Sequence, residues 1–438
     1  MLKSNKILFG VLFALTAAVG CGCAASLNCA EGGLMNYTDP NNYRGSDIER
    51  INAAIRDSRN TGGVVKIFKR KPDAVSERDF WLIDSAILIP GDTALHIVNC
   101  KIKLSDKSRD NWIRSANAMP GNPEVNVISR VHIIGEGSAI LEGADHPRAT
   151  GDSGKVLGVQ TYGTDAGKAN KRQKGDWRNI GILLVKVQDF TLQNLKMINS
   201  HSWAVSLEHC RRGIIRDLHF ESSENVMIDG KKATILNRDG LDLRKGCRDI
   251  TIENITGFSG DDLIALTAVG NKPRRPGSMI GSEFFGTDKN PEENHIFNIS
   301  IRNVRGYCAG GHHVIRFLNN RGVKMYNIQV SNVMDTSPAG VQAKAIVKIG
   351  DPCYGGASPL GDTSDFQIVN IHSRAQHAIL LGGSLQNSMI SNVLNYEPAN
   401  HPVTRQLGTE ETSGLFLNNL QTVGKDGTVI QTQTNTMK

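Results

Sequence analysis

The stretch from Asn237 to Asp262, which reads NRDGLDLRKGCRDITIENITGFSGDD, is the part of the sequence that most directly indicates the fold. Its second half, Asp249 to Phe258, places Ile250, Ile252 and Ile255 among polar residues. Apolar residues that alternate with polar ones are typical of a β-strand with one buried face. Short segments rich in Asp and Gly flank this run, so we expect one strand between two polar turns.

The same strand pattern, apolar-x-apolar-x-Asn-apolar, recurs beyond residue 180. The copies are FTLQNLKM at Asn194, ITIENITGF at Asn254, ISIRNVRG at Asn303, IQVSNVM at Asn332, FQIVNIHS at Asn370 and MISNVLN at Asn392. Some spacings match a solenoid coil of about 20 to 29 residues, and longer ones indicate inserted loops. The pattern predicts an all-β, parallel β-solenoid in which asparagines of successive coils form a hydrogen-bonded ladder that satisfies buried polar groups.

Further features set the limits of this solenoid. Ile48, Ile51, Ala54 and Ile55 fall on one face of a short helix that is expected to end near Ser58 and to cap the open end of the stack. The solenoid is expected to run from roughly residue 60 to 425, with early strands at 81–89, 95–104 and 131–141. A two-sheet sandwich, the alternative fold, needs hairpin signals such as Asn-Gly, which are scarce here.

The first 25 residues predict an export signal, and residues 26–438 a single catalytic domain. Lys3 and Lys6 precede an apolar run from Ile7 to Val19, followed by small residues. A lipoprotein cleavage that leaves a lipidated Cys21 and a plain cut near residue 24 are the two alternatives. No later stretch is apolar enough to span a bilayer. We therefore expect a protein that is periplasmic, secreted or tethered by lipid to the outer membrane.

Composition limits the classes of function. The chain of 438 residues is 39% hydrophobic and 21% charged, with a net charge of +7. That charge is too diffuse to indicate nucleic-acid binding and is compatible with an acidic polysaccharide. No Cys-x-x-Cys pair indicates zinc or redox chemistry. We expect no cofactor, no bound metal and no protein partner.

Three aspartates in the two polar turns are candidate catalytic residues. Asp239 lies 22 positions before Asp261, so one coil of about 20 to 29 residues places it beneath Asp261 and Asp262. Hydrolysis of a glycosidic bond needs one protonated and one ionised carboxyl group, and crowded carboxylates have pKa values that are pushed apart. The alternative reading of an Asp beside a Gly is a simple turn.

Four motifs, taken in order, resemble those of glycoside hydrolase family 28, the polygalacturonases and their relatives. They are NSHSW at Asn199–Trp203 with Cys210 downstream (similar to NSPxW), NRDG at Asn237–Gly240 (similar to NTDG), SGDD at Ser259–Asp262 (similar to GDD) and GYCAGGH at Gly306–His312 (similar to GYCxGGHG). The resemblance covers roughly residues 45 to 375. It implies a right-handed parallel β-helix that cleaves pectin-type polysaccharide.

The resemblance also implies roles for individual residues. Asp261 is expected to be the general acid, Asp239 and Asp262 to activate water, and His312 to orient the acid. Direct attack by water implies inversion at the anomeric carbon. Asn237, in the same motif as Asp239, is expected to contact the substrate.

Several positions depart from the family pattern. His313 and Arg316 replace small residues, so we expect bulky or cationic groups in the cleft. The family's RIK motif, which binds the substrate carboxylate, has no clean copy: Gln342 and Lys344 keep the Lys and lose the Arg, and a second register leaves Lys348 for the Arg. Without a bidentate Arg, we expect the enzyme not to act chiefly on plain homogalacturonan.

The segment of about residues 270–294 is an insertion, which we expect to border the cleft because insertions in solenoids emerge as loops. Two other functions stay open from the sequence. A β-helix polysaccharide lyase would use calcium, which three clustered aspartates are able to hold. A non-catalytic solenoid would only bind glycan.

Overall fold

The computed structural model describes residues 37–437 with several internal gaps. The residues outside the description are 1–36, 109, 123, 148–154, 158–170, 174–176, 270–283, 285–289, 320–321, 355 and 438. The expected export signal with Cys21, and most of the expected insertion, therefore lie outside the described residues. No described helix has the length and apolar character that crossing a membrane requires.

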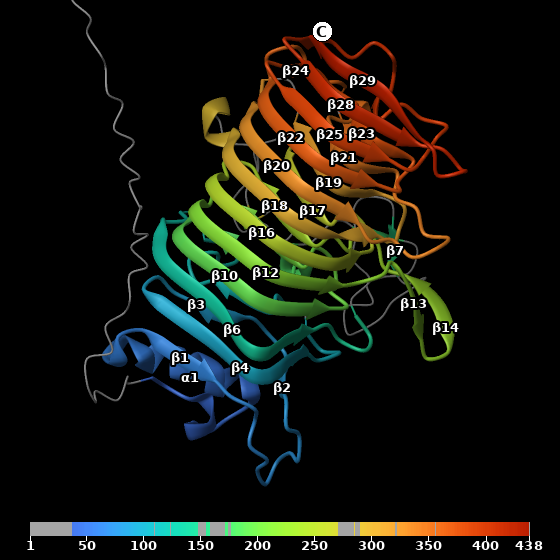
Figure 1. The fold of residues 1–438 in the computed structure, drawn as a ribbon. Helices are drawn as coiled ribbons and strands as arrows, with labels where there is room; N and C mark the ends of the chain where they lie inside the picture. Colours follow the sequence, from blue (N-terminus) through green and yellow to red (C-terminus); the bar gives the residue numbers. More distant parts are fainter. Residues whose placement is uncertain are drawn as a thin grey trace, which may run out of the picture. The chain divides into compact units, whose positions relative to one another are not determined.

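Two sheets wind along the chain as a right-handed parallel β-helix, which confirms the predicted fold (Figure 1). The larger sheet runs β1 (Val64–Ile67), β4 (Thr93–Leu104), β6 (Ile128–Glu142), β10 (Val187–Ile198), β12 (Arg211–Glu221), β16 (Arg248–Ser259), β18 (Ile296–Cys308), β20 (Met325–Asp335), β22 (Thr363–Ser373), β25 (Met389–Asn395), β28 (Phe416–Val423) and β29 (Val429–Met437). Beside this path lie β2 (Trp81–Ile83), β24 (Leu385–Gln386) and β27 (Thr412–Ser413).

The smaller sheet carries the candidate site. Its order is β3 (Ile87–Ile89), β5 (Ile113–Ser115), β9 (Ile182–Val185), β11 (Val205–Glu208), β15 (Leu241–Arg244), β17 (Ile264–Ala268), β19 (His313–Asn319), β21 (Ala345–Ile349), β23 (His377–Leu381) and β26 (Val403–Arg405). Except for β28 with β29, all pairings in the two sheets are parallel between described strands. Two antiparallel hairpins stand apart: β7 (Lys155–Leu157) with β8 (Lys171–Gln173), and β13 (Asn225–Ile228) with β14 (Lys231–Thr234). The sequence did not predict these hairpins or β29.

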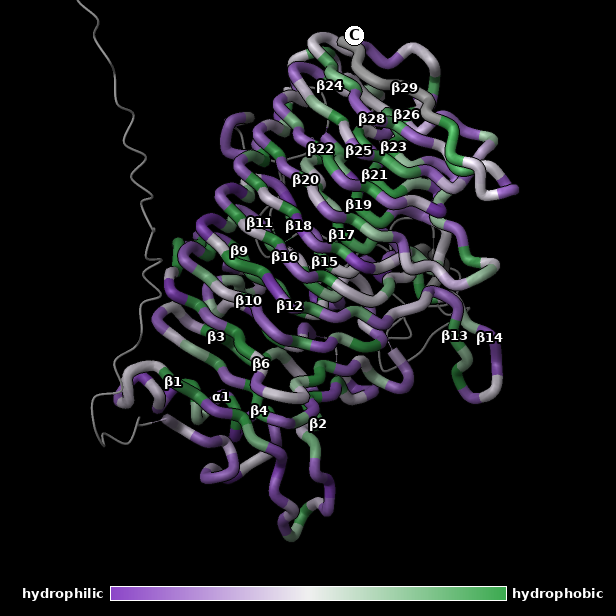
Figure 2. The backbone as a smooth tube through the Cα atoms, viewed as in Figure 1, coloured by the Kyte–Doolittle hydropathy of each residue, from purple (hydrophilic) through white to green (hydrophobic). Residues whose placement is uncertain are grey.

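Hydropathy explains why the two sheets differ. Strands of the larger sheet alternate buried and exposed residues, as Phe366, Ile368 and Ile371 in β22 illustrate, and the same alternation is visible along the tube in Figure 2. In contrast, every residue of β15, β17 and β21 is buried. These short strands are therefore covered on their outer face as well as on the core face, and that outer face holds the candidate site.

The predicted asparagine ladder is present at the surface. In each rung the side-chain N–H₂ of one Asn donates to the Oδ1 of the Asn one coil earlier, over 2.9–3.2 Å. The members are Asn254, Asn303, Asn332, Asn370, Asn392 and Asn419, all with φ between +49° and +60°. Asn tolerates this left-handed conformation better than most residues. The expectation of buried rungs was wrong, and Asn194 donates to the Gly135 carbonyl instead.

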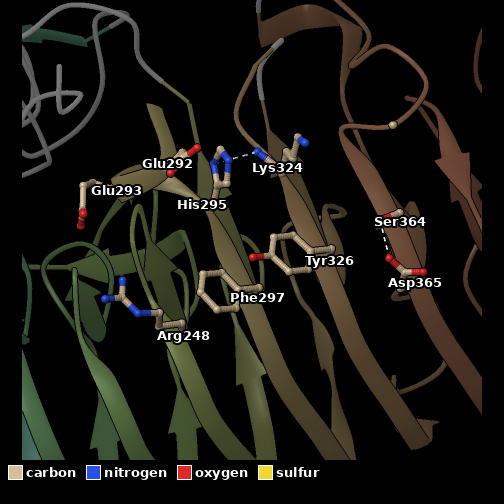
Figure 3. Close-up of a pocket in the computed structure, with 10 residues that line it drawn as sticks. Arg248, Glu292, Glu293, His295, Phe297, Lys324, Tyr326, Ser364 and Asp365 are labelled. Carbon is tan, nitrogen blue, oxygen red and sulfur yellow. Dashed lines mark hydrogen bonds between the residues drawn. The ribbon is translucent and has the colours of Figure 1, made fainter. Parts of the chain in front are cut away.

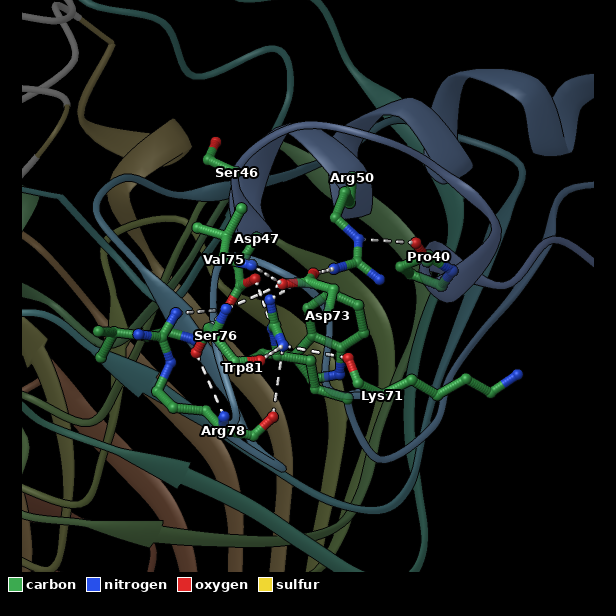
Figure 4. Close-up of polar contacts among 12 residues, drawn as sticks. Pro40, Ser46, Asp47, Arg50, Lys71, Asp73, Val75, Ser76, Arg78 and Trp81 are labelled. Atoms are coloured by element: carbon green, nitrogen blue, oxygen red, sulfur yellow. Dashed lines mark hydrogen bonds and ion pairs between the residues drawn. The ribbon is translucent and has the colours of Figure 1, made fainter.

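The predicted capping helix is α1 (Asp47–Ser58), which begins with a capping box of Ser46 and Glu49. A polar cluster fixes its first turn (Figure 4). Arg70 donates to Asp47 Oδ1 and to Asp73 Oδ2, both at 2.8 Å. Arg50 lies over the Trp81 ring at 4.9 Å. One-turn helices complete the fold: η1 (Pro40–Asn42), η2 (Arg59–Thr61), η3 (Trp177–Asn179), η4 (Pro291–Asn294) and η5 (Pro352–Tyr354).

Candidate functional site

Three carboxylates meet at the turns that lead into β15 and β17. Parallel pairing aligns Leu241 with Ile264, and the backbone N–H of Gly240 donates to the carbonyl of Asp262 at 3.0 Å. Asp239 therefore lies one coil before Asp262. Oxygens of Asp239, Asp261 and Asp262 all lie within 4.8 Å of one another. The structure thus brings together the three aspartates that the spacing predicted to be neighbours.

Asp262 is held as an anion. Its Oδ1 lies 2.7 Å from Nδ1 of His313 and accepts the backbone N–H of His313, while its Oδ2 accepts from Arg316 at 3.1 Å. Burial on its own raises a carboxyl pKa, but the charges and hydrogen bonds of His313 and Arg316 outweigh it and hold the pKa of Asp262 below its usual range. Asp262 is therefore a carboxylate throughout the physiological range.

Asp239 and Asp261 are shifted in the opposite direction. Burial is the largest cause, and neighbouring carboxylates add to it, so the pKa of each is raised well above the ordinary value. Asp239 Oδ1 is buried and has no hydrogen-bond partner among the described residues. One small patch thus contains an ionised carboxylate beside two carboxyl groups that favour the protonated form.

Asp261 has two further neighbours, His312 and Glu224. The Nδ1 of His312 lies 3.4 Å from Asp261 Oδ1, as the motif implied. Glu224, which the sequence analysis missed, has an oxygen within 4.8 Å of both and accepts the backbone N–H of Asn237. A Cβ on Gly260 would lie 2.7 Å from Glu224, so this glycine is needed for the close approach. Glu224 belongs to no motif, and no pattern in the sequence points to it.

A pocket of about 250 Å³ opens over these carboxylates. Two aromatic rings line it, and an arginine packs over each of them. The guanidinium of Arg244 lies 4.3 Å from the centre of the Trp203 ring, and that of Arg316 lies 4.8 Å from the centre of the Tyr354 ring. Aromatic walls, cations and convergent carboxylates are typical of a site for a polar organic ligand. Tyr354 and Arg244 were not predicted from the sequence.

Arg316 and His313 differ in how they relate to this pocket. Arg316 lines it as expected, but its guanidinium also pairs with Asp351 at 3.1 Å, and buried Lys348 pairs with the same Asp351 oxygen at 2.6 Å. His313 does not line the pocket and is only 4% exposed. The expectation that His313 contacts substrate is therefore corrected: its ring turns to Asp262.

The other predicted substrate-binding residues lie at different distances from the pocket. Asn237 lines it. Gln342 is exposed, and its side-chain amide donates to the Arg374 carbonyl at 3.1 Å and to Glu397 at 3.3 Å. The backbone N–H of Lys344 donates to the carbonyl of His312, which places it one coil beyond that motif. Neither Gln342 nor Lys344 lines the pocket.

Phe284 is the one residue of the range 270–289 that the structure describes, so the position of the insertion beside the cleft stays a prediction. The backbone N–H of Phe284 donates to Glu208, and its ring meets Trp177 edge-on at 5.0 Å. It shares an apolar cluster with Trp203, which lines the pocket. Arg274 and Arg275, two cations of the insertion, lie outside the described residues.

Comparison with known proteins supports the resemblance drawn from the motifs. A family model described as glycosyl hydrolases family 28 matches residues 143–273, which include the first three motifs and the three aspartates. The fourth motif, Gly306–His312, lies beyond that match. A search of curated proteins finds no match.

Several solved structures are similar in fold. A mutant tailspike protein of E. coli bacteriophage HK620, in complex with a pentasaccharide, aligns with a TM-score of 0.51 and 14% identity over 88% of this chain and 64% of that chain. The polygalacturonase from Erwinia carotovora ssp. carotovora gives 0.48 and 13%, over 91% and 99%. The Yersinia enterocolitica family 28 exopolygalacturonase gives 0.44 and 12%, over 87% and 78%. At such identities the likeness concerns the fold alone.

Proposed function

We propose that this chain is a glycoside hydrolase that cleaves a pectin-type polysaccharide. The observation that carries the proposal is the cluster of three carboxyl groups in one pocket, in which His313 and Arg316 hold both oxygens of Asp262 while Asp239 and Asp261 face other carboxylates. Asp261 has a raised pKa and Asp262 a lowered one. Paired groups whose environments push their pKa values apart are the acid and base that glycosidic hydrolysis requires.

In the proposed reaction, Asp261 gives its proton to the glycosidic oxygen as the C–O bond breaks. A water molecule attacks the anomeric carbon and gives up a proton to Asp262, with Asp239 holding the water. The acid is reprotonated from solvent, to which the Asp261 side chain is 18% exposed. His312, beside Asp261, orients it.

We propose inversion of the anomeric configuration, although the spacing alone does not favour it. Carboxyl groups of inverting enzymes are commonly about 6.5 to 9.5 Å apart, and here the nearest oxygens lie within 4.8 Å. Both oxygens of Asp262 are held by His313 and Arg316, which suits a base better than a nucleophile. Proton NMR early in hydrolysis decides the point, because a retained configuration would identify a covalent nucleophile.

The calcium-dependent lyase remains the alternative, because the three carboxylates are close enough to hold a cation. The donor chemistry fits poorly, since Asp262 is already neutralised by Arg316 and the other two carboxyl groups favour their protonated forms. Reducing-end assays on galacturonan, rhamnogalacturonan and their oligomers test the hydrolase. An unsaturated, ultraviolet-absorbing product would identify a lyase, and no product at all a glycan-binding solenoid.

Export, with or without a lipid on Cys21, is proposed as well and rests on the N-terminal sequence alone. Mass spectrometry of the mature N-terminus tests it. An N-terminal diacylglyceryl-cysteine at position 21 would establish the lipoprotein form, and a free N-terminus near residue 25 the secreted form.

A further inference from the structure

A second pocket, of about 630 Å³, lies where strands of the larger sheet begin (Figure 3). The acidic site lies on the outer face of the smaller sheet, so the two hollows belong to different faces of the β-helix. In the second pocket, parallel register aligns Arg248 of β16, Phe297 of β18, Tyr326 of β20 and Ser364 of β22 in one row across the coils. The proposed hydrolase activity uses none of these residues.

The first three residues of this row stack on one another, and the fourth, Ser364, does not. The rings of Phe297 and Tyr326 are 4.8 Å apart and inclined by only 5°, and the guanidinium of Arg248 lies 5.8 Å from the Phe297 ring. One face of Phe297 is thus covered by the cation and the other by Tyr326. On the far side of Tyr326 the next coil supplies only the small side chain of Ser364, and both residues line the pocket (Figure 3). Among the described residues no other ring or cation lies on that side, so Tyr326 presents a free aromatic face to the pocket.

The groups around this face suit a sugar. The C–H groups of a pyranose ring carry partial positive charge and pack on the negative face of an aromatic ring. Asp365, beside Ser364, offers carboxylate oxygens that accept from hydroxyls, and Glu292 lies on the opposite side of the pocket. Lys324 and Arg248 have no carboxylate partner among the described residues and are free to donate to oxygen.

The charge of the pocket favours a neutral ligand. Its carboxylates, Glu292, Glu293 and Asp365, outnumber the cations Arg248 and Lys324, and burial lowers the pKa of His295, which therefore stays neutral. A uronate would gain no net attraction there. A neighbouring pocket of about 170 Å³ shares Arg248 and Glu293, so the hollow extends along the coils toward Lys186 and Arg211, and the excess of carboxylates is confined to the end at Tyr326. This length accommodates more than one sugar.

We propose that this pocket is a non-catalytic binding site for a neutral oligosaccharide, one ring of which stacks on the free face of Tyr326 and continues the row from Arg248. Binding at this pocket does not require turnover at the acidic site. Such a site would keep the protein bound to the neutral branches of a branched polysaccharide while the acidic site cleaves another part of the same polymer.

Isothermal titration calorimetry tests the proposal. The titrants are neutral oligosaccharides from galactan, arabinan and xyloglucan, with a galacturonate oligosaccharide of matched length, and the protein is the full chain carrying Asp261→Asn so that nothing is hydrolysed. We expect at least one neutral oligosaccharide to bind. Any binding of the galacturonate oligosaccharide is expected to have the same affinity in the parent and in Tyr326→Ala. Tyr326→Ala is expected to weaken that binding by about tenfold or more.

Three further variants separate stacking from general damage to the fold. Tyr326→Phe keeps the ring and is expected to keep binding within about threefold. Ser364→Tyr fills the open space by extending the stack, and is expected to abolish binding while leaving the melting temperature unchanged or higher. Gln329→Ala, an exposed position on the same strand and outside the pocket, is the matched control. The proposal is overturned if no neutral oligosaccharide binds, or if Tyr326→Ala and Ser364→Tyr bind as tightly as the parent.

Discussion

Two aspartates in this molecule, Asp47 and Asp239, are buried to nearly the same degree, at 5% and 6% exposure, but in opposite surroundings. Asp47 accepts from Arg70 and Arg78 and from the backbone N–H of Leu82. Asp239 faces other carboxylates, and its Oδ1 has no partner among the described residues. A buried carboxylate whose partners are cations holds structure together, whereas one whose neighbours are carboxylates costs stability and marks a candidate site.

The largest expected effect is on turnover. Asp261→Asn removes the proposed proton donor while keeping the shape of the side chain. We expect kcat to fall by about 100-fold or more, since an amide is unable to protonate the leaving oxygen. Initial rates on the best substrate, with a melting curve of the same sample, measure this. Near-normal turnover by the folded variant would show that Asp261 is not the acid.

The matched change at the structural aspartate should act on folding instead. Asp47→Asn leaves Arg70 without its buried partner, and we expect the free energy of unfolding to fall by about 3 kcal/mol. The folded fraction should turn over at the parental rate. Urea titration and an activity assay on one preparation report both quantities.

Asp239→Asn is expected to change the free energy of unfolding in the direction opposite to Asp47→Asn. The folded-state pKa of Asp239 is raised, so its contribution to stability declines as the pH rises from the ordinary Asp value toward the folded pKa. At neutral pH the Asn variant should therefore be more stable than the parent, although less active. A loss of stability comparable to that of Asp47→Asn would remove the distinction between the two aspartates.

A smaller effect is expected from restoring the missing guanidinium. Gln342 lies outside the 250 Å³ pocket but in the segment one coil beyond His312, so an Arg there is able to meet a sugar that extends past the pocket. Gln342→Arg should therefore raise kcat/KM on oligogalacturonide relative to the natural substrate by roughly 5-fold, because charge-assisted hydrogen bonds to a carboxylate exceed neutral ones by at least about 1 kcal/mol. Glu397 accepts from Gln342 and would capture the new cation. The variant should therefore be compared with Gln342→Arg combined with Glu397→Gln. Unsubstituted oligogalacturonide as by far the best substrate of the parent would refute the specificity argument.

The smallest effect concerns the pH profile. Activity should need ionised Asp262 and protonated Asp261, so the rate falls as the pH drops through the lowered pKa of Asp262 and as it rises through the raised pKa of Asp261. Arg316 lowers both pKa values. In Arg316→Met both limbs of the profile should therefore move to higher pH. A profile that keeps its position would show that Arg316 does not control the ionisation of either group.

The sequence predicted those parts of the molecule that repeat or match a motif. Strand periodicity located β16, β18, β20 and β22, and a spacing of one coil placed Asp239 near Asp261. Contacts made by residues of the connecting segments were not predictable in this way, because these segments differ in length and do not follow the repeat. Glu224 reaches Asp261 from the segment before a hairpin, and Asp351 reaches Arg316 from a loop after β21.

The direction in which individual side chains point was also not predictable from the sequence. His313 follows a motif histidine and was expected to face the cleft, but His313 is buried against Asp262, whereas His312 is half exposed and lies beside Asp261. The strand β19 begins at His313, so the direction of this side chain depends on where the strand begins, which the motif alone does not determine. The pocket at Tyr326 was missed because its row of residues is visible only once the coils are aligned.

The asparagine ladder has a consequence for how such a chain diversifies. Successive rungs are 49, 29, 38, 22 and 27 residues apart, yet the amide contact persists at every step from Asn254 to Asn419. Chain length between rungs is thus uncoupled from the position of each coil. Insertions and deletions are therefore able to change the loops around the acidic site, or the surface around Tyr326, without moving the stacked coils.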